Sequence, residues 1–134
     1  MPKIKSPKKE EIKTILLIES DDFLADIYAT KFRQEGFKVK RASDGEQGLK
    51  MLTREKPDCL LLDILLPKKD GFQVIKETRA HTDFKKMPII VISNLGQKDD
   101  IDKALGLGAT DYFIKAHFVP SETVAKIKKL FKIK

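Results

Sequence analysis

Two hydrophobic patterns alternate along the chain. Five short segments have the length and composition of β-strands, and they cover residues 14–18, 37–41, 59–62, 89–93 and 111–115. The segment at 37–41 alternates between apolar and charged residues, which predicts a strand near the edge of the sheet with its charged residues facing water. Apolar residues at helical spacing follow each segment and predict five helices, at residues 23–35, 43–56, 72–79, 98–107 and 121–131. Because parallel strands need crossover connections, this order predicts an α/β fold in which helices cover both faces of a parallel five-stranded sheet.

Capping and breaking residues indicate where the predicted helices begin and end. Asp21 or Asp22 can cap the first helix, and Gly36 suits its left-handed end. Pro57 must follow the end of the second helix, because proline cannot continue a helix. Ser121 is the predicted cap of the last helix. The fourth predicted helix holds Ile101, Ala104 and Leu105, and the last helix is expected to turn its inner side to the domain with Val124, Ile127, Leu130 and Phe131.

The third segment leads into the most informative stretch of the chain, residues 59–71. The segment is too short for a helix and is apolar throughout, which is typical of a strand buried on both faces. Asp63 follows it, at the strand end where open α/β sheets bind ligands. The chain then turns at Pro67 and at Asp70-Gly71. The structural alternative is that Asp63 only caps the next helix.

Length, composition and charge favour one packed domain. The chain has 134 residues and 41% hydrophobic content, and we expect a flexible basic leader at residues 1–13 before a domain at 14–134. Much of the +7 net charge comes from lysines near the two ends, without interleaved aromatic residues, so nucleic acid is not an expected partner. No membrane span or secretory signal is recognisable, and a cytoplasmic location is expected. Cys59 is expected to be a buried, inert thiol.

Polar side chains stand at the carboxyl ends of four predicted strands. If these strands are neighbours, their ends converge on one crevice. Carboxylates there suit a hard divalent cation such as Mg²⁺, and a lysine and a hydroxyl suit phosphoryl oxygens. Together they indicate a carboxylate nucleophile that receives a phosphoryl group. The residues are Glu19, Ser20 and Asp21 after the first strand, Asp63 after the third, Ser93 at the end of the fourth and Lys115 at the end of the fifth.

From Thr14 to Phe131 the chain resembles a response-regulator receiver domain. The resemblance is carried by the acidic cluster after TILLI, the D-x-x-x-P-x-x-D-G run from Asp63 to Gly71, Ser93 after IIVI, and Lys115 after DYFI. It implies a doubly wound (βα)5 fold, a flavodoxin-like or CheY-like three-layer sandwich with strand order 2-1-3-4-5.

The resemblance also implies roles for individual residues. Asp63 would be the phospho-acceptor, with Mg²⁺ held by Asp63, Glu19 and the backbone carbonyl of Leu65. Ser93 would be the switch hydroxyl, Lys115 the cationic partner of the phosphoryl group, and Tyr112 the aromatic switch residue. The chain departs from the family pattern at Ser20, where a second metal-binding carboxylate is usual and for which Asp21 is a doubtful substitute; at Ala116, where proline is usual; and at Asn94, which is larger than usual.

The predicted function is that of a free-standing, single-domain response regulator. A sensor histidine kinase or a histidine phosphotransfer domain would supply the phosphoryl group, and the fourth helix, fifth strand and fifth helix would signal to an unidentified effector. The protein would catalyse only its own phosphorylation and dephosphorylation, as a monomer or a weak phosphorylation-dependent dimer.

Three alternatives remain open at this point. A phosphatase of the haloacid dehalogenase type would place a D-x-D pattern after the first strand, where this chain has Glu19-Ser20-Asp21. A flavodoxin-like cofactor binder would have a phosphate-binding loop rich in Ser, Thr and Gly at the same place. A degenerate receiver would act as a binding module without phosphorylation.

Overall fold

The structure is a computed structural model that describes residues 12–131. Within that range the strands are β1 (Thr14–Ile18), β2 (Lys38–Ala42), β3 (Cys59–Leu62), β4 (Ile89–Ser93) and β5 (Asp111–Ile114). The α-helices are α1 (Asp22–Gln34), α2 (Gly45–Glu55), α3 (Gly71–Ala80), α4 (Lys98–Leu107) and α5 (Pro120–Leu130), and short 3-10 helices lie at Thr82–Phe84 and Lys115–His117. All strands are parallel, in the order β2-β1-β3-β4-β5, which confirms the predicted doubly wound fold.

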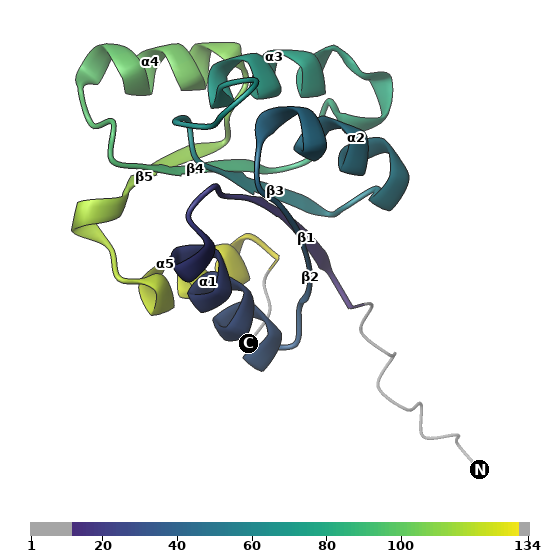
Figure 1. Ribbon diagram of the computed structural model, residues 1–134, viewed down its shortest axis with the longest axis vertical. Helices are drawn as coiled ribbons and strands as arrows, with labels where there is room; N and C mark the ends of the chain where they lie inside the picture. The colour runs from purple at the N-terminus through teal and green to yellow at the C-terminus, as the bar shows by residue number, and fades with distance from the viewer. Residues whose placement is uncertain (1–11, 132–134) are drawn as a thin grey trace.

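The sheet lies between two layers of helices (Figure 1). Helices α1 and α5 cover one face, and α2, α3 and α4 cover the other. Side chains alternate along the central strands: Leu60 and Leu62 of β3 pack under α2, α3 and α4, whereas Cys59 and Leu61 pack under α1 and α5. Because both faces are buried, the central strands are continuous apolar runs. Burial also raises the pKa of the Cys59 thiol to about 12, as expected of an inert cysteine.

Two predictions about the last helix are wrong. Helix α5 begins at Pro120 with Val119 as its N-cap, so Ser121 lies inside the helix instead of capping it. The reason is that proline is preorganised for the first helical position, and the Glu122 carboxylate accepts a hydrogen bond from the N–H of Val119 at 2.9 Å. Leu130 is 43% exposed, so it does not lie on the inner face of α5.

The predicted leader lies almost entirely outside the described residues. Lys13, its last residue, already contacts the domain: its carbonyl accepts a hydrogen bond from the N–H of Lys38 at 2.9 Å, and its ammonium group lies 5.7 Å from the centre of the Phe131 ring. Within residues 12–131, none of the helices has the length and apolar character needed to cross a membrane.

Candidate functional site

Glu19 directly follows β1, and Asp63 directly follows the neighbouring strand β3 at the same level of the sheet. Ile18 of β1 pairs with Leu62 of β3, and the next residue on each strand carries a carboxylate. Both residues are buried, with Glu19 3% and Asp63 5% exposed. The sheet register therefore brings the predicted acidic residues of the first and third strands side by side at the carboxyl edge.

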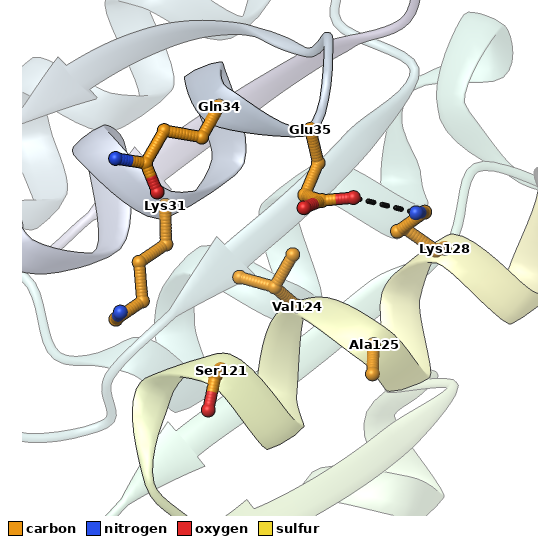
Figure 2. Close-up of a pocket in the computed structure, with 7 residues that line it drawn as sticks. All are labelled: Lys31, Gln34, Glu35, Ser121, Val124, Ala125 and Lys128. Carbon is orange, nitrogen blue, oxygen red and sulfur yellow. Dashed lines mark hydrogen bonds and ion pairs between the residues drawn. The ribbon is translucent and has the colours of Figure 1, made fainter.

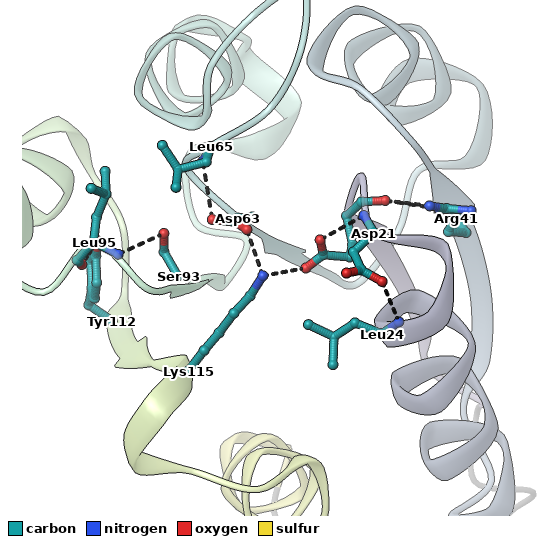
Figure 3. Close-up of polar contacts among 10 residues, drawn as sticks. Asp21, Leu24, Arg41, Asp63, Leu65, Ser93, Leu95, Tyr112 and Lys115 are labelled. Atoms are coloured by element: carbon teal, nitrogen blue, oxygen red, sulfur yellow. Dashed lines mark hydrogen bonds and ion pairs between the residues drawn. The ribbon is translucent and has the colours of Figure 1, made fainter.

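Lys115, directly after β5, contacts both carboxylates, and Figure 3 shows its side chain extending to Asp63. Its Nζ lies 2.7 Å from Oδ2 of Asp63 and 2.9 Å from Oε1 of Glu19. Burial lowers the pKa of Lys115, but the hydrogen bonds to Asp63 and Glu19 and their negative charges outweigh burial, so the net pKa is raised. The site therefore contains a fixed positive charge beside Asp63 at neutral pH.

Backbone contacts fix the chain directly after Asp63. The Oδ1 atom of Asp63 accepts a hydrogen bond from the N–H of Leu65 at 3.1 Å, and the N–H of Gly71 donates to the carbonyl of Ile64 at 2.8 Å. A Cβ at position 71 would lie 2.5 Å from the carbonyl oxygen of Asp63, so only glycine fits this close approach. The Asp-Gly turn predicted from the sequence thus packs against the backbone of Asp63 itself.

The rest of this loop joins two helices. The carbonyl of Pro67 accepts hydrogen bonds from the N–H of Lys69 at 2.7 Å and from the N–H of Gly45 at 3.3 Å, at the start of α2. The Asp70 carboxylate caps α3 by accepting from the N–H of Gln73 at 2.9 Å. Because Asp70 is the cap, the alternative in which Asp63 caps this helix is wrong.

Ser93 and Tyr112 both contact the backbone of Leu95 (Figure 3). Ser93 ends β4, which neighbours β3, and its hydroxyl accepts a hydrogen bond from the N–H of Leu95 at 3.3 Å. The hydroxyl of Tyr112, on β5, donates to the carbonyl of Leu95 at 2.5 Å. Burial raises the pKa of Tyr112 above its usual value, and the hydroxyl is a donor at neutral pH. A movement of Ser93 would therefore be transmitted to Tyr112 through the backbone of Leu95.

The loop between β1 and α1 turns fewer acidic groups toward Asp63 than predicted. The Asp21 carboxylate caps α1 by accepting from the N–H of Leu24 at 2.9 Å, and Ser20 is exposed. Across the part of the chain that the structure describes, no three His, Cys, Asp or Glu residues form a group that could hold a metal ion. The predicted role of Asp21 as a metal ligand conflicts with this placement, because its carboxylate is turned to the start of the helix.

The remaining groups still fit a hard divalent cation. Glu19 and Asp63 offer carboxylate oxygens, and Leu65, two residues after Asp63, would add a backbone carbonyl. Magnesium commonly binds one or two carboxylates and keeps several of its waters. These oxygen donors are therefore of the type and number that Mg²⁺ uses in proteins. It contains two carboxylates, and both also contact Lys115.

Arg41 is a contact residue that the sequence analysis missed. It lies on β2, one residue before the strand ends, and its Nε and Nη2 atoms donate to the backbone carbonyl of Glu19 at 3.0 and 2.6 Å. Its Nη2 also lies 2.9 Å from Oδ1 of Asp22. The only sequence signal was a basic residue at the end of an edge strand, which we took to be one of the charged residues facing water.

A separate hollow of about 300 Å³ lies between α1 and α5 (Figure 2). It is lined by Lys31, Gln34 and Glu35 of the α1 side and by Ser121, Val124, Ala125 and Lys128 of α5. Glu35 and Lys128 form an ion pair across it at 2.6 Å. None of the residues that surround Asp63 lines this hollow, so it is not part of the candidate site.

The chain is similar to known regulators over most of its own length. It is 40% identical over 104 residues to the transcriptional regulatory protein AfsQ1 of Streptomyces coelicolor, a match that covers 76% of this chain and 44% of AfsQ1. Other curated relatives are 34–36% identical over 88–90% of the chain. The chain spans about half the length of these relatives, with 44–49% of each covered.

Solved structures and a family profile agree with these relatives. The BeF3-activated N-terminal receiver domain of Klebsiella pneumoniae RstA superposes with a TM-score of 0.81 at 27% identity, covering 89% of this chain and 98% of that one. The Mn²⁺-bound form of response regulator Rcp1 gives 0.79 at 25% identity, covering 89% and 93%. The profile of the response regulator receiver domain matches residues 15–128. With that match over most of the chain, and with the fold and strand order described above, this protein belongs to the response regulator receiver domain family.

Proposed function

We propose that this receiver accepts a phosphoryl group on Asp63 from the phosphohistidine of a sensor kinase or a histidine phosphotransfer domain. The observation that carries the proposal is the position of Asp63, which is buried at the carboxyl end of β3 with the Lys115 ammonium group 2.7 Å away. A carboxylate oxygen is the nucleophile that this chemistry needs, and a fixed cation beside it stabilises the charge of the transferred group.

The transfer exchanges one bond for another. A bond forms between an Asp63 oxygen and phosphorus as the phosphorus–nitrogen bond of the phosphohistidine breaks, and the imidazole keeps that electron pair. Lys115 contacts Asp63 at Oδ2, while the N–H of Leu65 contacts Oδ1, so both oxygens of the nucleophile are oriented before the donor arrives.

Glu19, Asp63 and the carbonyl of Leu65 are the groups that would hold Mg²⁺. When bound, the cation would neutralise negative charge on the phosphoryl oxygens and on the two carboxylates. Glu19 is fixed in advance, because its carboxylate already contacts Lys115 and accepts a hydrogen bond from the N–H of Asp21 at 3.0 Å. Removal of Mg²⁺ should therefore slow phosphorylation without unfolding the protein.

Output would pass through the contacts around Leu95. A phosphoryl group on Asp63 would offer Ser93 a charged acceptor, and the Ser93 hydroxyl would change from accepting the N–H of Leu95 to donating to phosphate. The carbonyl of Leu95 holds Tyr112 on β5, so the change would reach the α4, β5 and α5 face. This face would contact the effector.

The remaining parts of the proposal concern the whole protein. The curated relatives are about twice as long as this chain, so free-standing signalling is a prediction, tested by the mass of the native protein in its cell. A cytoplasmic location and a monomer or weak phosphorylation-dependent dimer are predictions of the same kind. The phosphatase alternative is not supported, because the chain belongs to the receiver family and its candidate nucleophile follows β3.

Intact-mass spectrometry tests the proposal. The purified protein would be incubated with acetyl phosphate in the presence and absence of Mg²⁺, alongside Asp63→Asn and the matched control Asp83→Asn, which changes an exposed carboxylate away from the site. We expect Mg²⁺-dependent addition of one phosphoryl group to the parent and to Asp83→Asn, and none to Asp63→Asn. Equal labelling of all three proteins would contradict the proposal.

A second candidate function is that of a degenerate receiver that binds its partner without phosphorylation. It is favoured by Ser20, which is exposed where the family usually has an acidic ligand, and by the turning of Asp21 toward the start of α1. This candidate predicts no labelling of the parent at saturating Mg²⁺ and acetyl phosphate, so the same experiment separates the two functions.

A further inference from the structure

Every polar group of Glu19 has a partner in the structure. Its N–H donates to the carbonyl of Ala42 at 3.1 Å, and its own carbonyl accepts both hydrogen bonds from Arg41, at 3.0 and 2.6 Å. Its carboxylate contacts Lys115 through Oε1 and the N–H of Asp21 through Oε2. The backbone of Glu19 is therefore held from β2 on both sides of its Cα, while its side chain faces the site.

The two hydrogen bonds from the Arg41 side chain to the Glu19 carbonyl do not belong to the backbone ladder between β1 and β2. The side chain is only 27% exposed, and its guanidinium lies against the loop that joins β1 to α1. A guanidinium presents several N–H donors in a rigid plane, so it can hold one carbonyl with two atoms and still contact Asp22 at 2.9 Å. The Asp22 side chain is 87% exposed, so solvent screens this ion pair, and we expect it to hold Arg41 less firmly than the carbonyl of Glu19 does.

We propose that Arg41 is a positioning residue of this site, which fixes the β1–α1 loop and thereby keeps the Glu19 carboxylate turned toward Lys115 and Asp63. The importance of Arg41 for phosphorylation rests on the proposed function. The contact between Arg41 and Glu19 can be tested without any phosphoryl donor. Because Ser20 supplies no second carboxylate here, the placement of Glu19 is the main contribution of this loop to cation binding.

Positioning and electrostatics predict opposite effects when Arg41 is changed. As a positive charge near the carboxylates, Arg41 would repel a cation, so its loss would tighten Mg²⁺ binding if charge were its only effect. If Arg41 instead acts by holding Glu19 in place, loss of Arg41 would weaken Mg²⁺ binding. Lysine at this position keeps the charge but not the two-atom contact, so Arg41→Lys separates the two effects.

The experiment compares Arg41→Met, Arg41→Lys and the control Asp22→Asn, which removes the exposed partner but leaves the contact with Glu19. The first measurement is amide hydrogen exchange without metal. The N–H of Asp21 reports on the Glu19 carboxylate, and the N–H of Leu61 in the central strand β3 reports on global unfolding. The second measurement is a Mg²⁺ titration of each unphosphorylated protein, followed by NMR shifts.

We expect Asp21 exchange to accelerate severalfold relative to Leu61 in both Arg41 variants and to stay unchanged in Asp22→Asn. Mg²⁺ affinity should fall about tenfold in both Arg41 variants, as for other residues that orient a metal ligand. Unchanged Asp21 exchange in both variants would overturn the proposal, and so would tighter Mg²⁺ binding by Arg41→Met with parental binding by Arg41→Lys. If the parent itself bound no Mg²⁺, the proposed function would fail, while the exchange measurement would still decide the role of Arg41.

Discussion

The ammonium group of Lys115 lies 2.7 Å from Oδ2 of Asp63, although the two residues are 52 positions apart in the sequence. Strand β4 lies between their strands, so the lysine side chain must cross the end of β4 to make this contact. The same ammonium group contacts Glu19, which directly follows β1, and β1 lies beyond β3 in the sheet. One cation therefore ties together the ends of three strands and offsets two buried carboxylates.

Lys115→Gln should destabilise the protein. Glu19 and Asp63 would face each other without a cation, and removal of one partner from a buried charge group typically costs about 3 kcal/mol or more. Urea unfolding measures the change. The matched control is Lys98→Gln, which removes an exposed i,i+4 pair with Asp102 and should leave the free energy of unfolding unchanged within error. Equal stability of Lys115→Gln and the parent would contradict the account.

The stability difference between Lys115→Gln and the parent should depend on pH. The pKa of Lys115 is raised in the folded state, so its contribution is fully present below its unfolded pKa of about 10.4 and is lost as the pH rises through the folded value. The difference should therefore be constant between about pH 7 and 9 and should narrow above about pH 10.5. A difference that narrows on acidification toward about pH 7 would assign the effect to another group.

Gly71→Ala should also destabilise the fold. The added Cβ would lie 2.5 Å from the carbonyl oxygen of Asp63 and 2.6 Å from Cα of Ile64, both of which are backbone atoms that cannot turn aside. Forced overpacking of this kind costs about 1–3 kcal/mol. Gly106→Ala is the control, because a Cβ there meets nothing within 4 Å, and alanine in α4 should stabilise by about 0.5–1 kcal/mol. If both substitutions changed the free energy of unfolding in the same direction, the packing argument would be refuted.

Ser20→Asp should tighten Mg²⁺ binding about tenfold or more, because a carboxylate replaces a hydroxyl at the position where the family supplies a direct ligand. The metal-free protein should become slightly less stable, since another negative charge joins Glu19 and Asp63. A magnesium titration of both proteins gives the answer. Equal affinities would show either that the cation never uses position 20 or that Asp21 leaves its cap on α1 to bind it.

The phosphorylated state should be comparatively long-lived. Hydrolysis needs a water in line with the phosphorus, and Leu65 and Leu95, the residues two past Asp63 and Ser93, cannot hydrogen-bond to it through their side chains. Leu65 is 56% exposed, so Leu65→Asn changes a side chain close to Asp63 without disturbing the core. Loss of the phosphoryl group, followed by intact mass, should be faster in Leu65→Asn and faster still with Leu95→Gln. Identical decay in all three proteins would place control of the water elsewhere.

Sequence patterns predicted the fold well because the sheet is buried on both faces. Runs such as 59–62 are apolar throughout, and their polar ends mark the carboxyl edge where Glu19, Asp63 and Lys115 meet. The position of each polar group within a loop was less predictable. The sequence offered Asp21 both as a cap of the first helix and as a substitute metal ligand, and only the structure shows that its carboxylate turns to the N–H of Leu24.

Long-range contacts of edge residues were not predictable at all. Arg41 stands in an alternating edge strand where a charged residue normally faces water, and its contact with the Glu19 carbonyl depends on how β2 pairs with β1. Ser121 was misassigned for the opposite reason, since a strong capping residue was present but Pro120 already occupied the first position of the helix. Hydrophobic periodicity reports neither contacts between strands nor competition between adjacent residues for a helix start.

The measurement that tests the central claim most directly is the location of the phosphoryl group on the intact protein. The parent chain would be labelled with acetyl phosphate and Mg²⁺, and fragmentation in the mass spectrometer would assign the added mass to one residue. The account predicts that the label is found on Asp63 and that chelation of Mg²⁺ slows its addition. A label on another residue, or equal labelling with and without Mg²⁺, would contradict it.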